Sequence, residues 1–547
     1  MGVFDYNRRS TLTVNVGNVP MGSEWPVRIQ SMTNTMTDDV ERSAEQCLRI
    51  VEAGGEIVRL TAQGVRQAEA IGMIRNSLRA QGCDVPLVAD IHFNPRAAFA
   101  AAALTDKVRI NPGNFVDPAR TFQHLEYTDE EYQAELDKIR ETLLPFIALC
   151  REHGTAVRLG VNHGSLSDRI MSRYGNTPSG MVESVMEFLR VFVAERFFDI
   201  VISMKASNVV VMVEAVRRLV KAMDAEDMHF PLHLGVTEAG FGEDGRIKSA
   251  VGIGTLMSEG LGDTIRVSLS EDPEKEIPVA RKLVDYIASR AGHAAIEGDY
   301  CPGYDPVSPP KRATRLVGEA RTPLVVASCD RDLITGALRP DFFAEDLLDL
   351  AEPVLVITPD NANIPGSLLQ QLHQLEAQGN DCPVVARVKY DDSDLEWLQV
   401  KAGADLGPVV MSGLVDGIWI DAPECESQDD VMRIAFGILQ AARLRMSKTE
   451  FISCPSCGRT LFDLQTTVKR VQAATAHLTH LKIGVMGCIV NGPGEMADAD
   501  YGYVGAGPGH ISLYKNKECV EKNIPEGEAI DHLVALIKQH GDWTDPA

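Results

Sequence analysis

Short apolar segments alternate with longer amphipathic stretches over residues 25–268 of the chain. The short segments have the length of buried strands, and stretches between them such as Ser43–Ala53 and Val209–Met223 have helical periodicity. Alternating strands and helices predict right-handed crossovers and a parallel sheet, and about eight such units in about 250 residues favour a closed (β/α)8 TIM barrel. The predicted strands are Pro26–Met32, Glu56–Thr61, Pro86–Ile91, Lys107–Asn111, Ala156–Val161, Asp199–Met204, Pro231–Val236 and Asp263–Ser268. An open doubly wound sheet is the alternative, but no G-x-G-x-x-G follows the first strand.

The regular alternation ends before a segment rich in proline and glycine, Cys301–Pro310, which predicts a coil. Beyond it, a less regular α/β pattern predicts strands at Leu324–Ser328, Val354–Thr358, Val384–Val388 and Gly417–Ile420. The last hundred or so residues predict a strand leading into Cys454, a helix, a second strand, a hairpin and a closing helix at Ala529–Gln539. We therefore predict an α/β protein with three domains: a TIM barrel (1–291), an inserted α/β domain resembling a partial barrel (292–447) and an α+β domain (448–547).

Composition narrows the functional classes. The chain has 547 residues, 45% of them hydrophobic, and a net charge of -24, which disfavours nucleic acid as a general partner because the field repels phosphates. No apolar run is long enough to span a bilayer, and the first residues have no secretory apolar region. Eleven scattered cysteines do not form a secreted disulfide framework. We expect a cytoplasmic protein that binds neither nucleic acid nor membrane.

The ends of the predicted barrel strands are unusually polar. Residues two apart, such as Arg109 and Asn111 or Arg266 and Ser268, project to the same face of a strand. In a barrel this face is the interior near the C-terminal mouth, where active sites lie. Four arginines and a lysine converging there would repel one another unless an anion is bound, and a diphosphate or polycarboxylate fits that need. The strand-end residues are Arg59, Asp90, His92, Arg109, Asn111, Arg158, Asn162, Ser203, Lys205, His233, Arg266 and Ser268.

Basic residues at strand ends of the inserted region have acids beside them. Arg331 lies between Asp330 and Asp332, and Lys389 precedes Asp391 and Asp392. Local neutralisation is typical of a solvated turn, so we expect the inserted region to be a spacer without catalytic residues of its own.

Three cysteines in the last domain have the spacing of metal ligands. Cys454 and Cys457 form a C-x-x-C pair, and Cys488 follows on a separate glycine-rich turn. Three thiolates leave a fourth position open or held by a weaker ligand, as a catalytic metal requires; Glu495 is the nearest candidate, ahead of Cys519. A redox dithiol and a zinc site are the alternatives, and we favour an iron–sulfur cluster.

These residues lie within longer segments that resemble the 4-hydroxy-3-methylbut-2-enyl diphosphate synthases, iron–sulfur enzymes of the methylerythritol phosphate route to isoprenoids. The segments that carry the resemblance include Arg109–Asn114, Gly160–Leu166, His233–Gly240, Gly262–Ser268, Cys454–Cys457 and Gly487–Glu495. The region at about 292–447 resembles the extra domain of the three-domain form found in plants and some bacteria. Because the chain begins without a transit peptide, we expect a bacterial source.

The resemblance implies a reductive ring opening and dehydration of 2-C-methyl-D-erythritol 2,4-cyclodiphosphate. It also implies a [4Fe–4S] cluster held by Cys454, Cys457, Cys488 and Glu495. A diphosphate would be bound by Arg59, Arg109, Arg158, Lys205 and Arg266, helped by Asn111, Asn162 and Ser268. Glu238 would be a carboxylate near the reacting carbons, acting in proton transfer, and Glu495 would share in catalysis. Ferredoxin or flavodoxin would supply the electrons.

Two other functions are compatible with the sequence. One is a barrel enzyme similar to dihydropteroate synthase with a zinc-stabilised tail, and the other is a non-enzymatic anion-binding protein with a structural metal. A homodimer is compatible with the sequence too, and the cluster and the barrel could then meet within one chain or between two.

Overall fold

The computed structural model describes residues 2–91, 93–116, 126–312, 314, 322–350, 353–489, 494, 496 and 498–546. They divide into two compact units. The larger consists of Ser10–Phe241, Gly262–Ala280 and Glu450–Ala547, and the smaller of Met1–Arg9, Gly242–Leu261 and Arg281–Thr449. The predicted boundaries at 291 and 447 remain predictions. In the described part of the chain, no helix is both long and apolar enough for a membrane span.

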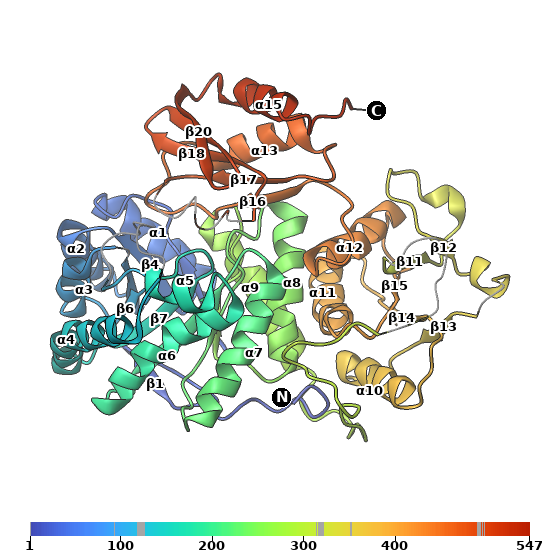
Figure 1. Cartoon of the computed structure of the whole chain (residues 1–547), viewed down its shortest axis with the longest axis horizontal. Helices are drawn as coiled ribbons and strands as arrows, with labels where there is room; N and C mark the ends of the chain where they lie inside the picture. The colour runs from blue at the N-terminus through green and yellow to red at the C-terminus, as the bar shows by residue number, and fades with distance from the viewer. Residues whose placement is uncertain are drawn as a thin grey trace. The chain divides into compact units, whose positions relative to one another are not determined.

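The larger unit contains a nearly closed barrel of parallel strands (Figure 1). Its hydrogen-bonded order is β8-β7-β6-β5-β4-β3-β10-β9, and a parallel bridge between Ile202 and Leu232 links the two ends of the sheet. The strands are β3 (Arg28–Met32), β4 (Ile57–Ala62), β5 (Leu87–Ile91), β6 (Lys107–Ile110), β7 (Ala156–Asn162), β8 (Ile200–Lys205), β9 (His233–Leu234) and β10 (Thr264–Ile265). Their residues are almost all buried, as expected for parallel strands covered on both faces. The predicted TIM barrel is confirmed.

Helices follow the barrel strands in sequence, and local signals fix several of their ends. Thr128 and Glu131 form a capping box at the start of α4, and Thr177 caps α6, whose first residue is Pro178. The helices of this unit are α1 (Val40–Glu52), α2 (Val65–Ala80), α3 (Pro95–Ala102), α4 (Asp129–His153), α5 (Asp168–Tyr174), α6 (Pro178–Ala194) and α7 (Val209–Ala225). Helix α9 (Pro273–Ala288) starts in this unit and continues into the smaller one.

A hairpin that the sequence analysis did not predict precedes the barrel. Strands β1 (Val14–Val16) and β2 (Val19–Met21) pair antiparallel. Val14, Val16 and Met21 pack in one apolar cluster with residues of the barrel strands: Ile57, Val88, Ala156 and Val201. Those four lie near the N-terminal ends of their strands, so the apolar core fills that end and leaves the C-terminal end for polar side chains.

The C-terminal part of the larger unit is a mixed sheet in the order β16-β17-β18-β19-β20. The first three strands are parallel and the last three antiparallel: β16 (Glu450–Ser453), β17 (Lys482–Met486), β18 (Tyr501–Gly507), β19 (His510–Lys515) and β20 (Glu518–Pro525). Helices α13 (Leu464–Thr475) and α15 (Ala529–Gln539) share one apolar core with this sheet (Figure 1). The predicted elements are all present, and β20 is an addition.

Hydrogen bonds attach the start of this sheet to the barrel mouth. Ser453, the last residue of β16, forms a parallel bridge with Ala239. The hydroxyl of Ser270 lies 2.8 Å from that of Ser453 and donates to the carbonyl of Cys454 at 3.0 Å. All four residues belong to the larger unit, and these contacts fix Cys454 beside the loops that follow β9 and β10.

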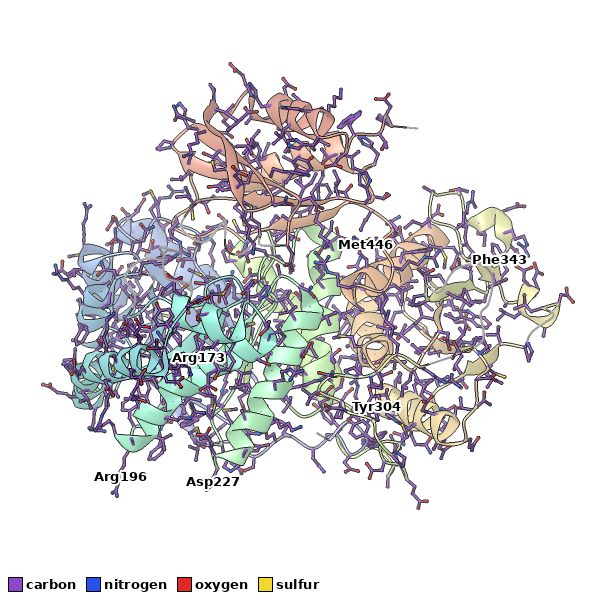
Figure 2. The ribbon with its side chains drawn as sticks, viewed as in Figure 1. Arg173, Arg196, Asp227, Tyr304, Phe343 and Met446 are labelled. Carbon is purple, nitrogen blue, oxygen red and sulfur yellow. The ribbon has the colours of Figure 1, made fainter. Side chains whose placement is uncertain are left out.

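The smaller unit contains a half-barrel sheet of five parallel strands in the order β12-β11-β15-β14-β13. The four predicted strands are present, and β12 is an additional short one: β11 (Leu324–Ala327), β12 (Phe342–Phe343), β13 (Leu355–Ile357), β14 (Val384–Lys389) and β15 (Gly417–Asp421). The 3-10 turns η1 (Arg331–Leu333) and η2 (Asp346–Leu348) flank β12. Arg331 stacks 4.2 Å over the ring of Phe343, and Figure 2 labels this phenylalanine. The helices are α8 (Gly242–Ser258), α10 (Ile364–Ala377), α11 (Leu395–Met411) and α12 (Gln428–Ala441).

Helices α8 and α11 of this unit cross very closely. A Cβ added to Gly254 would lie 2.9 Å from the Cα of Ala404, and one added to Gly403 would lie 2.7 Å from the Cβ of Ala250. Glycine on both helices therefore allows backbone contact that any side chain would prevent. Nearby, the buried Asp405 binds Arg290 at 2.7 Å and accepts hydrogen bonds from two tyrosine hydroxyls.

Candidate functional site

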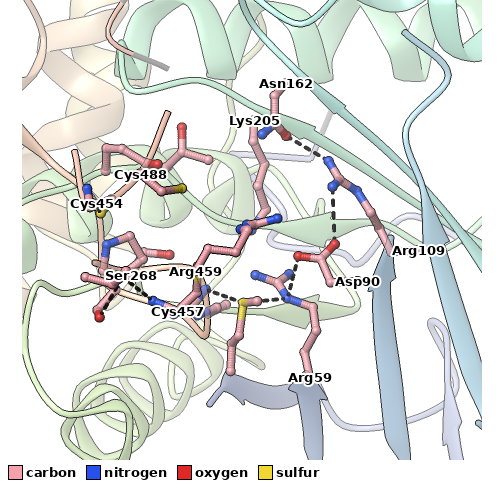
Figure 3. Close-up of a pocket in the computed structure, with 18 of the residues that line it drawn as sticks. Arg59, Asp90, Arg109, Asn162, Lys205, Ser268, Cys454, Cys457, Arg459 and Cys488 are labelled. Atoms are coloured by element: carbon pink, nitrogen blue, oxygen red, sulfur yellow. Dashed lines mark hydrogen bonds and ion pairs between the residues drawn. The ribbon is translucent and has the colours of Figure 1, made fainter. Parts of the chain in front are cut away.

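A pocket at the C-terminal ends of the barrel strands brings together most of the predicted site residues (Figure 3). Side chains from β4 to β8 and from the segments after β9 and β10 form one wall, and the cysteine loops form the other. The predicted residues that line it are Arg59, Arg109, Arg158, Asn162, Lys205, Glu238, Arg266, Ser268, Cys454, Cys457 and Cys488. All of them belong to the larger unit of a single chain.

Two predicted residues are not part of this description. Glu495 lies outside the described residues, as does His92. Gly494, which precedes Glu495 in the chain, is described. Its carbonyl oxygen lies so close to Gly164, in the loop after β7, that a Cβ on Gly164 would be 2.3 Å from it. Asn111 is buried at the end of β6 but does not line the pocket; its amide instead holds Gly113 and Ser165 at 3.0 and 2.9 Å.

Asp90 at the end of β5 is shared by three of the arginines. Its carboxylate lies 3.2 Å from Arg109, 3.6 Å from Arg59 and 3.8 Å from Arg158. All four side chains are buried. A buried acid among several cations orients them without neutralising all of them. Sequence analysis noted Asp90 as a polar strand end but gave it no role.

A second acid, Glu276, fixes Arg266. The two side chains form paired hydrogen bonds of 2.9 Å from Nε and Nη2. Burial alone would lower the pKa of Arg266, but the charge and hydrogen bonds of Glu276, together with the charges of Glu238 and Asp90, more than offset it and raise that pKa. Glu276 lies on α9, away from any strand end, so the pattern of strand ends gave no signal for it.

The remaining cations are poorly compensated. Burial, together with neighbouring arginines, lowers the pKa of Lys205 and of Arg158 well below their usual values. Burial also lowers the pKa of Arg59 to about 10, although Asp90 opposes the shift. Nε and Nη1 of Arg158 are buried and find no hydrogen-bond partner among the described residues. Such groups are costly to bury, so this wall is suited to a polyanion that supplies acceptors and charge.

Space for these long side chains comes from two glycines. A Cβ on Gly160 in β7 would lie 2.5 Å from Nε of Arg109, and one on Gly235 would lie 3.0 Å from Nζ of Lys205. Arg109 crosses over β7 and donates to the carbonyl of Gly160 at 2.8 Å. The missing side chains thus let both cations lie flat across neighbouring strands.

Glu238 lines the pocket with a strained backbone. Its φ of 50° is in the left-handed region, which costs a non-glycine residue free energy and is often found at functional sites. Its charge is the second cause, after burial, that raises the pKa of Cys454. The charge of the Glu238 carboxylate on the barrel wall thus acts on Cys454 of the cysteine loop.

The three cysteines come from two loops of the C-terminal sheet. Cys454 and Cys457 follow β16, and Cys488 follows β17. The backbone N–H of Gly487 donates to the sulfur of Cys454 at 3.2 Å. No three histidine, cysteine or acidic side chains of the described part of the chain are close enough to hold a metal ion. The donor chemistry nevertheless fits a thiolate-ligated cluster, because three sulfurs and N–H donors to sulfur line one pocket. Cys519, on β20, is not among the residues that line it.

Arg459 is a pocket residue that the sequence analysis missed. It follows Cys457 by two residues, is buried, and interacts electrostatically with Cys457, Cys488 and Asp90 (Figure 3). Its position next to the C-x-x-C pair was the available signal.

Comparison with known proteins assigns the family. One family model, the GcpE TIM-barrel domain, matches residues 11–281, and a second, the GcpE protein C-terminal domain, matches residues 450–539. A protein of Parabacteroides distasonis is 53% identical over the whole of both chains. The chain belongs to the GcpE family.

Other GcpE relatives include a protein of Porphyromonas gingivalis, 48% identical with both chains fully covered, and one of Chlorobaculum tepidum, 38% identical over all of this chain and 91% of the other. All three are named 4-hydroxy-3-methylbut-2-en-1-yl diphosphate synthase (flavodoxin). A dihydropteroate synthase of Yersinia pestis aligns with 51% of this chain and all of its own at a TM-score of 0.34 and 12% identity, which is too remote to bear on function. The names of the relatives support the synthase interpretation and not the alternative of a dihydropteroate synthase.

Proposed function

We propose that this chain converts 2-C-methyl-D-erythritol 2,4-cyclodiphosphate to 4-hydroxy-3-methylbut-2-enyl diphosphate by reductive ring opening with loss of water. The observation that carries the proposal is one pocket, lined both by a group of cations that share few acids and by three cysteines. A cyclic diphosphate supplies the anion that the cations require, and a redox centre beside it supplies the two electrons. The names of the GcpE relatives agree with this reaction.

In this proposal the barrel wall binds the diphosphate. Arginine matches phosphate oxygens in pairs, and lysine adds a point charge. The binding residues would be Arg59, Arg109, Arg158, Lys205 and Arg266, with Asn162 and Ser268 as neutral donors. Asn111 would act indirectly, through the loop that it holds at Gly113 and Ser165.

Cys454, Cys457, Cys488 and Glu495 would hold a [4Fe–4S] cluster. When bound, such a cluster supplies single electrons and an iron whose weaker carboxylate ligand can be exchanged. Glu238 would present its carboxylate to the reacting carbons and take part in proton transfer, since it lines the same pocket as the barrel cations and Cys454. The barrel residues would meanwhile keep the diphosphate fixed as the ring opens.

Flavodoxin is the electron donor that we propose, because the names of the relatives include it; ferredoxin is the alternative. We further propose that the protein acts in the bacterial cytoplasm and that the inserted region is a spacer.

The test is anaerobic purification followed by iron and sulfide analysis and by turnover of the cyclic diphosphate with a chemical reductant. Cys488→Ser should lose the cluster and all activity, because two thiolates anchor the iron core poorly. Cys519→Ser is the matched control: it removes a half-buried thiol of the same domain that does not line the pocket. A Cys488→Ser protein with normal iron content and full activity would exclude the proposed function.

A further inference from the structure

Arg459 is the charged residue that the cysteine loops contribute to the pocket, among the described residues that line it. Its residue exposure is only 8%. The guanidinium donates a hydrogen bond to Cys457, while Nε and Nη1 are buried without a hydrogen-bond partner in the described part of the chain. A buried guanidinium in this state lacks acceptors on the side of its Nε and Nη1 groups.

Hydrogen bonds and a close packing contact fix the backbone around Arg459. The N–H of Cys457 donates to the hydroxyl of Thr460 at 3.1 Å, and Ser456 donates to the same oxygen at 3.0 Å. Gly458 lies against the barrel, where a Cβ would be 2.6 Å from the carbonyl oxygen of Thr35. The loop therefore fixes the start of the Arg459 side chain at the barrel mouth.

The electrostatic neighbours of Arg459 lie on both walls. It interacts with the sulfurs of Cys457 and Cys488 and with Asp90, the acid shared by three barrel arginines. Asp90 already forms ion pairs with three barrel arginines, Arg59, Arg109 and Arg158, through its two oxygens. Asp90 and the two sulfurs favour the charged form of Arg459. Because Asp90 is also shared by the three barrel arginines, the guanidinium groups around it outnumber its single carboxylate, and the pocket keeps an excess of positive charge for an anion.

We propose that Arg459 is a substrate-binding residue, a further cation of the anion site supplied by the cysteine loop rather than by the barrel. This proposal rests on the proposed function and deepens it. Nε and Nη1 of Arg459 bind a phosphate oxygen, while the same guanidinium donates to Cys457. One side chain thus contacts both the bound diphosphate and a proposed cluster ligand, and it sets the distance between the two.

The experiment measures the affinity of inorganic diphosphate for the anaerobically purified holoprotein by calorimetry, with iron content determined on the same samples. Arg459→Met removes the charge and the donors but keeps a long apolar chain. Arg459→Lys keeps the charge without the planar fork. Arg470→Met, at an exposed position of α13 in the same domain, is the control.

We expect Arg459→Met to weaken diphosphate binding by at least about thirtyfold, which is the lower end of the loss expected for truncating one partner of a buried charge pair. Arg459→Lys should recover most of that loss, and the control should bind as the wild type does, all with unchanged iron content. The KM for the cyclic diphosphate should rise in the Met variant in parallel with the dissociation constant.

Two results would overturn the proposal. Wild-type diphosphate affinity in Arg459→Met would show that the guanidinium does not touch the anion. Loss of iron from both the Met and the Lys variants would make Arg459 a residue that retains the cluster instead. Failure of the proposed function is distinguishable from either, because the wild type itself would then lack iron or turnover.

Discussion

The chain contains two parallel sheets whose strand ends carry basic residues. The two sheets differ in how many acidic side chains pair with those residues. In the half-barrel sheet each cation has an acid of its own: Arg387 binds Asp421 at 2.5 Å, and Lys389 lies 3.2 Å from Asp391. In the barrel, Arg59, Arg109 and Arg158 share Asp90. The strand ends of two parallel sheets thus differ in how their positive charges are compensated. Where several cations share one acid, the site is suited to an anion; where each cation has its own acid, the surface is stable without one.

The largest expected effect concerns the buried acids of the two regions. Asp90→Asn and Asp405→Asn each remove the charge that compensates buried arginine, and each should lower the free energy of unfolding by about 3–5 kcal/mol. Inorganic diphosphate at about 100 times its dissociation constant for the wild type should add about 2.7 kcal/mol to the wild type and to the Asp405 variant alike, because both keep the anion site. The Asp90 variant should gain more at the same concentration, because loss of the competing carboxylate leaves its arginines free to bind the anion more tightly. Chemical denaturation with and without diphosphate measures both values. Equal rescue of the two variants would mean that the comparison is mistaken.

The next effect concerns the cations. Arg109→Ala should weaken diphosphate binding by about 2–5 kcal/mol, because it removes one partner of a buried charge contact. Arg387→Ala, at a strand end of the half-barrel sheet, should leave binding unchanged, since Asp421 already compensates that arginine. Calorimetric titration compares the two, and an equal loss in both would place the anion site elsewhere.

The smallest effect concerns pH. Burial lowers the pKa of His373 in the smaller unit to about 4, and burial with the charge of Lys205 lowers that of His233 in the barrel well below its usual value. The unfolded chain then binds protons that the folded chain does not, so the free energy of unfolding should fall as the pH drops below about 6.5.

For His373 this loss should continue to about pH 4 and stay within about 3 kcal/mol. His373→Gln should flatten the dependence, and denaturation at several pH values checks it. The His373 contribution should be indifferent to diphosphate, whereas bound anion should reduce the His233 contribution because it offsets the nearby cations. A stability that increases as the pH falls through this range would contradict the sign.

Much of the architecture could be predicted because buried parallel strands leave a strong pattern. The eight barrel strands lie close to their predicted positions, and α15 matches its predicted range. Helix α11 was missed, since it is apolar on most sides and contains Gly403, Gly407 and Pro408, which weaken the helical period. The hairpin β1–β2 was missed because strands of three residues are too short to show alternation.

The candidate site could be predicted from the sequence only in part, for a related reason. Polar residues at strand ends, such as Arg59 and Lys205, are visible once a barrel is assumed. Glu276 comes from a helix, and Arg459 from a loop, so their closeness to the pocket depends on tertiary packing that no local pattern encodes.

Two absent side chains also govern how this anion site can vary by mutation. A single base change converts a glycine codon to an alanine codon, and at Gly160 the new methyl group would collide with Arg109 at 2.5 Å, before any charge had changed. At Gly235 the limit comes from the carbonyl oxygen of Arg266 at 2.9 Å as well as from Nζ of Lys205 at 3.0 Å. Inheritance of the site therefore requires selection on empty space as well as on charge, and engineering of new anion specificity should alter Gly160 together with Arg109 and keep Gly235.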